Sequence, residues 1–188
     1  MTLLPPNVVI SYIELDIKIS TNILWYNRNR LEVFMTIRIE TLSDEHIESL
    51  VKFKLDQQME MHSNITWETF SELEHAERQF LYNHMNKDLY MYGLFEEEAL
   101  VAISGMHIYE SSPGTMSMNG LLAYICNVYT LPQFRKRGYQ NQLLEHCISI
   151  AEERQIRMMF LGTSNPIAAD FYNKHDFQVN KMLLVRYK

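Results

Sequence analysis

Cysteine is scarce in this 188-residue chain, which contains only Cys126 and Cys147. A disulfide-rich scaffold is therefore excluded, and because both cysteines lie in apolar periodic segments we expect reduced core residues in a reducing compartment. The seven histidines are scattered and include no His-x-x-x-His pair backed by carboxylates. Because metal sites are usually marked by such spacings, the sequence predicts no metal site.

Long apolar runs and a surplus of positive charge are also missing. No run is long enough to cross a bilayer, and the N-terminus lacks a basic segment followed by an apolar one. We therefore expect a cytoplasmic protein without membrane contact. The net charge of -6 argues against a nucleic-acid binder and suits an amine or another cation as substrate. The sequence leaves open whether the protein is a monomer or a homodimer.

The first 34 residues differ from the rest of the chain. They begin with Met1-Thr-Leu-Leu-Pro-Pro, a poor start for a strand or a helix because the two prolines remove backbone donors. A second methionine, Met35, opens a short alternating strand. We expect residues 35–188 to form one domain, and residues 1–34 to be an appendage or the product of a misplaced start codon.

Hydrophobic periodicity within this domain predicts alternating groups of strands and helices. Ser43 and Thr66 are good N-caps for two early helices, and Leu121 to Thr130 is apolar enough for a central strand buried on both faces. The predicted order is β-α-α-β-β-β-α-β-α-β, an α/β protein with a mixed sheet and helices on its faces. The expected elements are strand 35–40, helices 43–59 and 66–85, strands 88–95, 99–109 and 121–130, a helix to about 154, strand 157–161, a helix from 165, and paired strands in 176–188.

The stretch from Phe134 to Gln140 places three cations and a glycine between a predicted strand and helix. Cations are disfavoured at a helix N-terminus by about 0.3–1 kcal/mol each, unless an anion binds there. Arg135 and Arg137 can form bidentate contacts with phosphate, and Gly138 permits a close backbone approach. A solvated basic turn remains the alternative. The spacing matches neither a P-loop nor a dinucleotide fingerprint.

A second constellation opens with Asn165, a good N-cap, followed by Pro166 at the first helical position. Helical geometry places Asn165, Ala169 and Tyr172 near one stripe, with a polar group at each end. The alternative is that Tyr172 and its neighbouring phenylalanines are ordinary core aromatics.

Together the two constellations resemble the GNAT superfamily of acyl-CoA-dependent N-acetyltransferases. The resemblance rests on Val128-Tyr129-Thr130-x-Pro-x-Phe134-Arg135-x-x-Gly138 and on Asn165-x-x-Ala168-x-x-Phe171-Tyr172-x-Lys174-x-x-Phe177. It implies a mostly antiparallel twisted sheet flanked by helices, in which the fourth strand splays from the fifth. The acetyl-CoA co-substrate would enter that gap, with its pantetheine amides paired to the backbone of Val128 and Thr130 and its pyrophosphate on the amides from Arg135 to Gln140. The residues implied in its binding are Val128, Tyr129, Thr130, Arg135, Lys136, Arg137, Gly138, Tyr139, Gln140 and Asn165.

The family pattern differs from this chain at three positions. Gln140 replaces a small residue, Lys136 stands where glycine is common, and Asp176 stands where glycine precedes Phe177. Gln140 would either crowd the pyrophosphate or donate to it. Asp176 would have to adopt the left-handed conformation, which aspartate tolerates better than most residues.

The resemblance also implies a reaction, in which an amine attacks the acetyl thioester directly in a ternary complex. Tyr172 resembles the general acid that protonates the departing CoA thiolate. Tyr124, Glu110 and His107 are candidate bases, and the two early helices with the loop 110–120 would shape the acceptor site. A non-catalytic acyl-CoA-binding module on the same fold is the alternative function.

Overall fold

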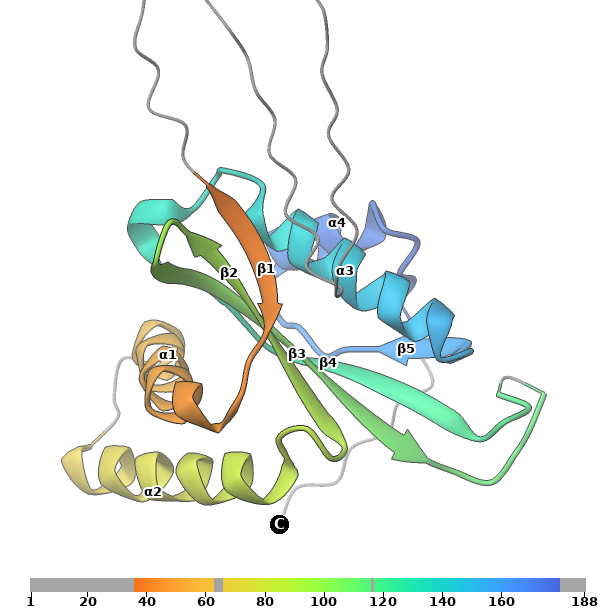
Figure 1. Ribbon diagram of the computed structural model, residues 1–188, viewed down its shortest axis with the longest axis horizontal. Helices are drawn as coiled ribbons and strands as arrows, with labels where there is room; N and C mark the ends of the chain where they lie inside the picture. The colour runs from red at the N-terminus through yellow and green to blue at the C-terminus, as the bar shows by residue number, and fades with distance from the viewer. Residues whose placement is uncertain (1–35, 63–65, 116, 180–188) are drawn as a thin grey trace, which may run out of the picture.

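The computed structural model describes residues 36–62, 66–115 and 117–179 (Figure 1). Within these ranges, five strands and four α-helices follow one another in the predicted order, with a 3₁₀ turn before α1 and another before α3. The strands are β1 (Ile37–Thr41), β2 (Leu89–Glu96), β3 (Ala99–Glu110), β4 (Leu121–Thr130) and β5 (Met158–Phe160). The helices are α1 (Ile47–Met61), α2 (Trp67–His84), α3 (Tyr139–Glu153) and α4 (Pro166–Asn173), and the 3₁₀ turns are η1 (Asp44–His46) and η2 (Pro132–Phe134).

The five strands form one sheet in the order β1-β2-β3-β4-β5. Neighbouring strands are antiparallel except β4 and β5, which are parallel. The β4–β5 pairing covers only Leu122 to Tyr124 opposite Met158 to Phe160. Beyond Tyr124, β4 continues to Thr130 with β3 on one side and without a β5 partner on the other.

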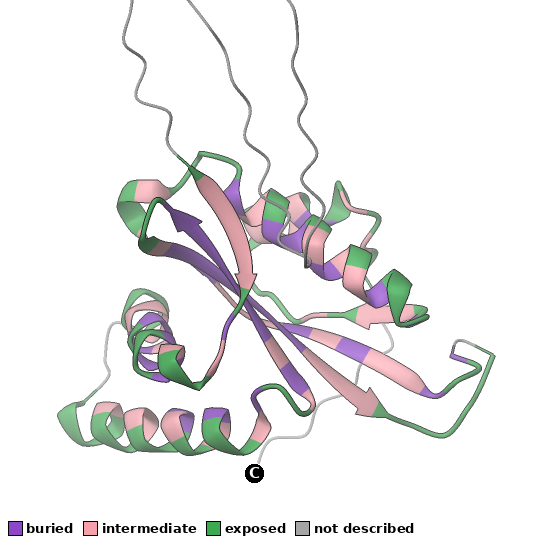
Figure 2. Cartoon of the chain, viewed as in Figure 1, coloured by how far each residue is buried: buried purple, intermediate pink, exposed green. Residues whose placement is uncertain are grey.

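Helices cover both faces of the sheet (Figure 1), and each face has its own apolar core. Successive β2 residues point to opposite faces, so Met91 packs with the α1 and α2 side and Leu94 with the α3 side. The first core includes Leu50 of α1 and Leu81 of α2, and the second includes Leu143 of α3. Burial is most continuous along β2 and β3 (Figure 2).

Strand β4 is less buried than its apolar sequence predicted. Tyr124 and the segment from Cys126 to Val128 are only partly buried. Tyr129 and Thr130 at the end of β4 are buried, so the partial burial does not follow the edge that the short β5 leaves open. The prediction of a central strand buried on both faces therefore holds for only part of β4.

The fold confirms the predicted mixed α/β architecture and the element order from the first strand to α4. The predicted appendage at residues 1–34 lies outside the described residues, and so does the end of the paired strands expected in 176–188. Across the three described ranges, no helix combines the length and the apolar character that crossing a membrane requires.

Candidate active site

The open half of β4 contains a β-bulge at Asn127. Ile103 of β3 pairs with Tyr129 and Gly105 pairs with Cys126, so both Asn127 and Val128 lie opposite a single β3 residue. Asn127 adopts φ = 49°, the left-handed region that asparagine tolerates well. Bulges bend a strand and interrupt its ladder, so this one turns β4 away from regular pairing where the gap beside β5 opens.

Two helices hold the bulge in place. Lys54 Nζ of α1 donates to Asn127 Oδ1 at 3.0 Å, and Asn127 Nδ2 donates to Glu77 of α2 at 3.3 Å. Burial is the largest effect on Glu77 and raises its pKa, against the lowering effects of Lys54 and the Asn127 amide. The bulge is therefore held against α1 and α2 by these contacts.

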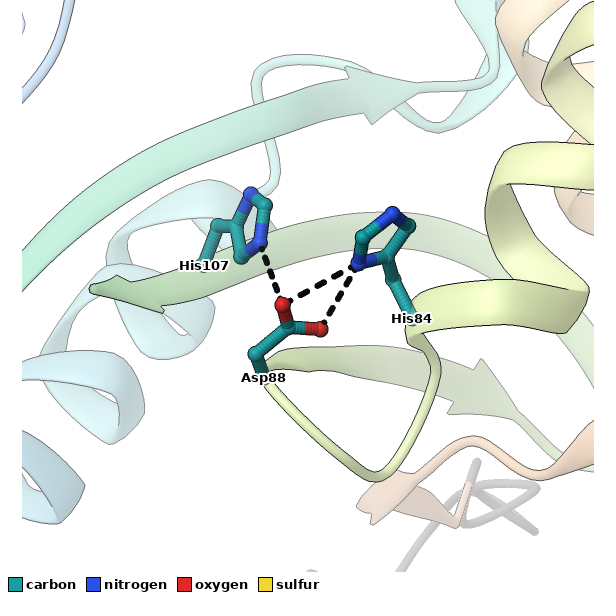
Figure 3. A group of neighbouring side chains, drawn as sticks. All are labelled: His84, Asp88 and His107. Carbon is teal, nitrogen blue, oxygen red and sulfur yellow. Dashed lines mark hydrogen bonds and ion pairs between the residues drawn. The ribbon is translucent and has the colours of Figure 1, made fainter. Parts of the chain in front are cut away.

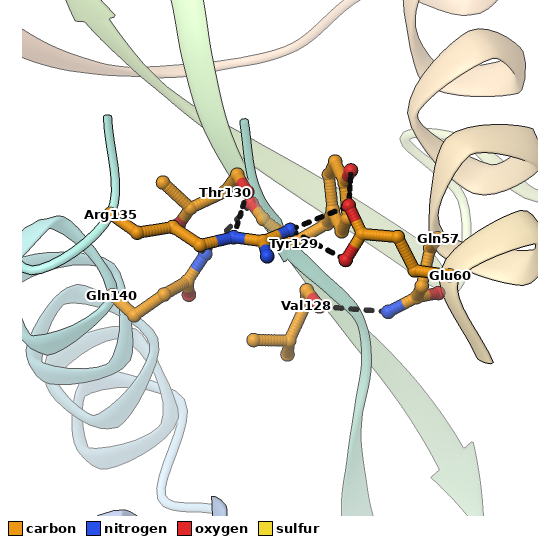
Figure 4. A network of polar contacts seen from close by, with 7 residues as sticks. All are labelled: Gln57, Glu60, Val128, Tyr129, Thr130, Arg135 and Gln140. Atoms are coloured by element: carbon orange, nitrogen blue, oxygen red, sulfur yellow. Dashed lines mark hydrogen bonds and ion pairs between the residues drawn. The ribbon is translucent and has the colours of Figure 1, made fainter. Parts of the chain in front are cut away.

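Side chains engage the carbonyls of Val128 and Thr130, which the family resemblance assigns to pantetheine (Figure 4). Gln57 Nε2 of α1 donates to the Val128 carbonyl at 2.8 Å, and Arg135 Nε donates to the Thr130 carbonyl at 2.9 Å. A carbonyl has two lone pairs, so each can accept a second donor. A ligand along this edge must share these carbonyls or displace the side chains.

The turn from Lys136 into α3 presents free backbone amides. Lys136 has φ = 64° and Gly138 has φ = 78°, and no side chain caps the helix. The N–H groups of residues 136–141 donate to none of the described residues, and the first bond of the helix start runs from Gln142 N to the Gly138 carbonyl. Amides converging at a helix N-terminus in this way favour an anion.

The two arginine side chains of this turn, which the sequence assigned to phosphate, are each paired with a carboxylate. Arg135 contacts both oxygens of Glu60 at 2.7 and 2.8 Å, and the Tyr129 hydroxyl donates to the same carboxylate at 2.6 Å (Figure 4). Arg137 contacts Glu96 at 2.9 and 3.0 Å. Each arginine is thus neutralised by an acid from a distant element.

Tyrosines join both of these ion pairs. The hydroxyl of Tyr139, the first residue of α3, donates to Glu96, while Tyr129 lies beside Glu60. Burial raises the pKa of Tyr129 to about 12, with a further contribution from Glu60. Burial also acts to raise the pKa of Glu60, but the hydrogen bonds from Tyr129 and Arg135 outweigh it and lower that pKa. Glu60 is therefore held as a carboxylate that ties α1 to the turn.

The Gln140 side chain is hydrogen-bonded to the sheet. Its amide nitrogen lies 2.8 Å from the Tyr129 carbonyl, 2.9 Å from Thr130 Oγ1 and 3.2 Å from the Ile103 carbonyl. The side chain therefore anchors the first turn of α3 to β3 and β4. At the position where the family usually has a small residue, this chain therefore has a side chain that links α3 to the sheet.

A pocket of about 360 Å³ lies between the start of α3 and the end of α4. Its walls come from the turn, the first residues of α3 and one side of α4. Lys136 and Lys174 bring positive charge, and His175 Nε2 lies 2.9 Å from Asn141 Oδ1. The lining residues are Thr130, Phe134, Arg135, Lys136, Gly138, Tyr139, Gln140, Asn141, Phe171, Lys174 and His175.

Helix α4 begins as predicted. The Asn165 side chain accepts from Ile167 N at 2.9 Å, so its observed contact is the N-cap, and it does not line the pocket. Asp176 has φ = 65°, the left-handed conformation that its position requires. This turn brings Phe177 back against Tyr172, with ring centroids 5.7 Å apart.

Tyr172 is buried, with only 8% of its surface exposed. Burial raises its pKa to about 12, and Cys147 and Tyr124 contribute in the same direction. Its hydroxyl has no hydrogen-bond partner among the described residues. Tyr172 is therefore protonated at neutral pH, and its hydroxyl is available to an acceptor.

The three candidate bases do not form one group. His107 and Tyr124 are cross-strand partners in β3 and β4, whereas Glu110 lies at the exposed end of β3 opposite Leu121. The sequence missed Gln57, Glu60 and Glu96, which bind the predicted site from α1 and β2. No local spacing marks these residues, because each reaches the site only through the fold.

Known proteins share both the sequence pattern and the fold. A sequence model of the acetyltransferase (GNAT) family matches residues 59–177. A predicted acetyltransferase from Clostridium acetobutylicum, solved with acetyl-CoA, is 22% identical with a TM-score of 0.69, over 80% of this chain and 96% of that one. A GCN5-related N-acetyltransferase from Ralstonia eutropha JMP134 is 17% identical with a TM-score of 0.71, over 80% of this chain and 98% of that one.

No curated protein sequence matches the chain. The two solved structures are too distant in sequence to show more than the fold, which they share with this chain along nearly their whole length. The family match is different in kind, because it covers more than half of the chain and includes the bulge, the basic turn and α4. This chain belongs to the GNAT acetyltransferase family.

Proposed function

We propose that this protein is an N-acetyltransferase that transfers the acetyl group of acetyl-CoA to a primary amine by direct attack in a ternary complex. The observation that carries the proposal is the half of β4 beyond Tyr124, which has no strand partner on its β5 side among the described residues and lies next to the free amides at the start of α3. An extended chain bearing amides suits the open strand edge, and a pyrophosphate suits the free N–H groups.

The cofactor site in this proposal is built mainly from backbone. The amides from Lys136 to Asn141 bind the pyrophosphate, and the 128–130 edge binds the pantetheine arm. Lys136 and Lys174 supply the unpaired positive charge of the pocket, because Arg135 and Arg137 are paired with carboxylates. Gln140 and Asn165 contribute by fixing the starts of α3 and α4.

In the reaction, the amine nitrogen attacks the thioester carbonyl carbon, a C–N bond forms, and the C–S electron pair leaves on sulfur. Tyr172, with a pKa of about 12, keeps its proton throughout the neutral range. Full transfer to a thiolate whose conjugate acid has a pKa near 8.5 is uphill by about 5 kcal/mol. Tyr172 therefore acts in this proposal as a hydrogen-bond donor to the departing sulfur. The proton of the product thiol comes from the attacking nitrogen, which becomes acidic as the bond forms.

We propose a cytoplasmic enzyme that acts as a monomer or homodimer and binds neither nucleic acid nor membrane. Both cysteines are free, Cys147 being buried and Cys126 partly buried, which suits a reducing compartment.

Turnover with acetyl-CoA tests the proposal. Free thiol is measured over a panel of primary amines that includes small amines, polyamines, aminoglycosides and peptide N-termini, with acetyl-CoA binding measured separately by calorimetry. We expect saturable binding and thiol release that depends on one class of amine. Binding without amine-dependent release across the panel would instead support the non-catalytic acyl-CoA-binding module, and absence of binding would reject both functions.

A further inference from the structure

Three side chains capable of binding metal meet on the α1/α2 face of the sheet. His84 is the last residue of α2, Asp88 lies in the turn before β2, and His107 lies in β3 (Figure 3). His84 Nδ1 lies 2.9 and 3.1 Å from the two Asp88 oxygens, and His107 Nε2 lies 3.3 Å from Asp88 Oδ2. One ligand atom from each residue lies within 4.8 Å of the other two.

We propose that His84, Asp88 and His107 form a binding site for a divalent transition-metal ion, with zinc as the best fit. Two imidazole nitrogens and one carboxylate oxygen are a ligand set that zinc prefers, whereas magnesium and calcium prefer oxygen alone. With bonds of about 2.0–2.1 Å, tetrahedral ligand atoms lie about 3.3–3.4 Å apart. Asp88 Oδ2 lies 3.1 Å from His84 Nδ1 and 3.3 Å from His107 Nε2, within a few tenths of an ångström of that value.

Backbone hydrogen bonds bring the three residues together before any ion binds. Asp88 N donates to the His84 carbonyl at 3.3 Å, which closes the turn after α2 and aligns the two side chains. Ile108 N donates to the Asp88 carbonyl at 2.7 Å, which places the turn beside His107. The geometry is therefore set by the fold, so binding requires little reorganisation of the chain.

Aromatic contacts restrict the two imidazole rings. The His84 ring lies 4.5 Å from the Phe80 ring, and the His107 ring lies 4.5 Å from the Tyr109 ring, measured between centroids. The two histidine rings are 5.5 Å apart and inclined at 63° to each other. Their inner nitrogens both face the Asp88 carboxylate (Figure 3).

The site is open on one side. His107 is 13% exposed, whereas the side chains of His84 and Asp88 are 35% and 44% exposed. Three protein ligands leave a tetrahedral ion one position for water or another ligand, and the exposed side provides entry. Without an ion, the carboxylate accepts from both facing N–H groups. With an ion, each ring carries a single proton on its outer nitrogen, so binding removes the proton that faces Asp88.

His107 is also one of the candidate bases, but zinc binding to the full chain can be measured without acetyl transfer. The untagged protein is stripped with chelator and titrated with zinc chloride by calorimetry, and cobalt(II) is used as a spectroscopic substitute. We expect one ion per chain and the visible d–d absorption of tetrahedral cobalt. His84→Asn, Asp88→Asn and His107→Asn should each weaken binding by at least about tenfold.

His75→Asn is the matched control, because His75 is an exposed histidine on the same helix as His84. It should bind zinc as the wild type does. Circular dichroism and thermal melting of each variant without metal separate lost binding from lost folding. Asp88, the most exposed of the three side chains, provides the variant least expected to disturb the core. Zinc binding that is absent, or that survives in folded His84→Asn and Asp88→Asn, would overturn the proposal.

Discussion

The two proposed binding sites, at the start of α3 and at the end of α2, are built from different parts of the chain. At the start of α3 the arginine side chains are paired with carboxylates and the backbone amides of 136–141 are free of described partners. At the end of α2 the backbone is hydrogen-bonded through the turn, and the side chains of His84, Asp88 and His107 converge. One site presents backbone and the other presents side chains.

This contrast predicts how each site responds to substitution. A site made of amides depends on φ and ψ, so most side chains can change there without loss as long as the turn keeps its shape. A site made of side chains depends on the identity of each residue. At the start of α3, substitution should therefore matter only at residues whose side chain donates a hydrogen bond to the ligand or whose backbone conformation sets the turn.

Tyr172→Phe should have the largest effect, because Tyr172 is the side chain that the proposed reaction uses at the backbone-built site. Removing its hydroxyl removes the donor to the departing sulfur, and we expect kcat to fall by about 100-fold. Acetyl-CoA affinity should change little, since Tyr172 does not line the pocket at the start of α3. Steady-state kinetics and calorimetry measure the two quantities. An unchanged kcat would remove Tyr172 from the mechanism.

The local structure of the proposed backbone-built site was largely predictable from the sequence. Phe134 to Gln140 is contiguous, and the strand before it and the glycine within it carry strong local preferences. The Asn165 cap and the left-handed Asp176 are also local features, and the structure confirms both. Local preferences act over a few residues, which is why a single sequence reveals them.

The partners of this site were not predictable. The sequence assigned Arg135 and Arg137 to phosphate, because nothing near them indicates that Glu60 and Glu96 will be their neighbours. The sequence analysis missed the cluster of His84, Asp88 and His107 for the same reason, because His107 reaches the turn only through the register between β2 and β3. Contacts between distant residues depend on packing and topology, which periodicity does not encode.

Gly138→Ala tests whether the site at the start of α3 depends on its backbone conformation, and its effect should be intermediate in size. Gly138 has φ = 78°, and an added Cβ would meet nothing within 4 Å, so the cost is conformational rather than steric crowding. We expect a loss of about 1–2 kcal/mol in the free energy of unfolding, with weaker acetyl-CoA binding if the turn relaxes instead. Urea denaturation and calorimetry distinguish the two. Gly162→Ala is the control, because Gly162 has equal space and no positive φ.

The smallest effect on acetyl-CoA binding is expected for substitutions in the Arg135–Glu60 pair. If Arg135 stays paired with Glu60 when acetyl-CoA binds, Arg135→Gln should change acetyl-CoA affinity by less than about threefold. Loss of a bidentate phosphate contact would lower the affinity far more. Both side chains are 41% exposed, so a double-mutant cycle with Glu60→Gln should give a coupling of only about 0.2–1 kcal/mol. A tenfold or greater loss of affinity in Arg135→Gln would mean that the arginine leaves Glu60 for the phosphate.

The pH dependence of the same pair gives a second measurement. The folded protein lowers the pKa of Glu60 below its model-compound value of 4.5, so the charged form stabilises the fold above that pH. This stabilisation is lost as the pH falls through the lowered pKa of the folded state.

Glu60→Gln should therefore be less stable than the wild type at pH 7, and the two melting temperatures should converge as the pH falls below 4.5. Arg135→Gln should show the same convergence, because its partner must be ionised for the pair to exist. A stability difference that persists unchanged at low pH would mean that Glu60 stabilises α1 through packing rather than through its charge.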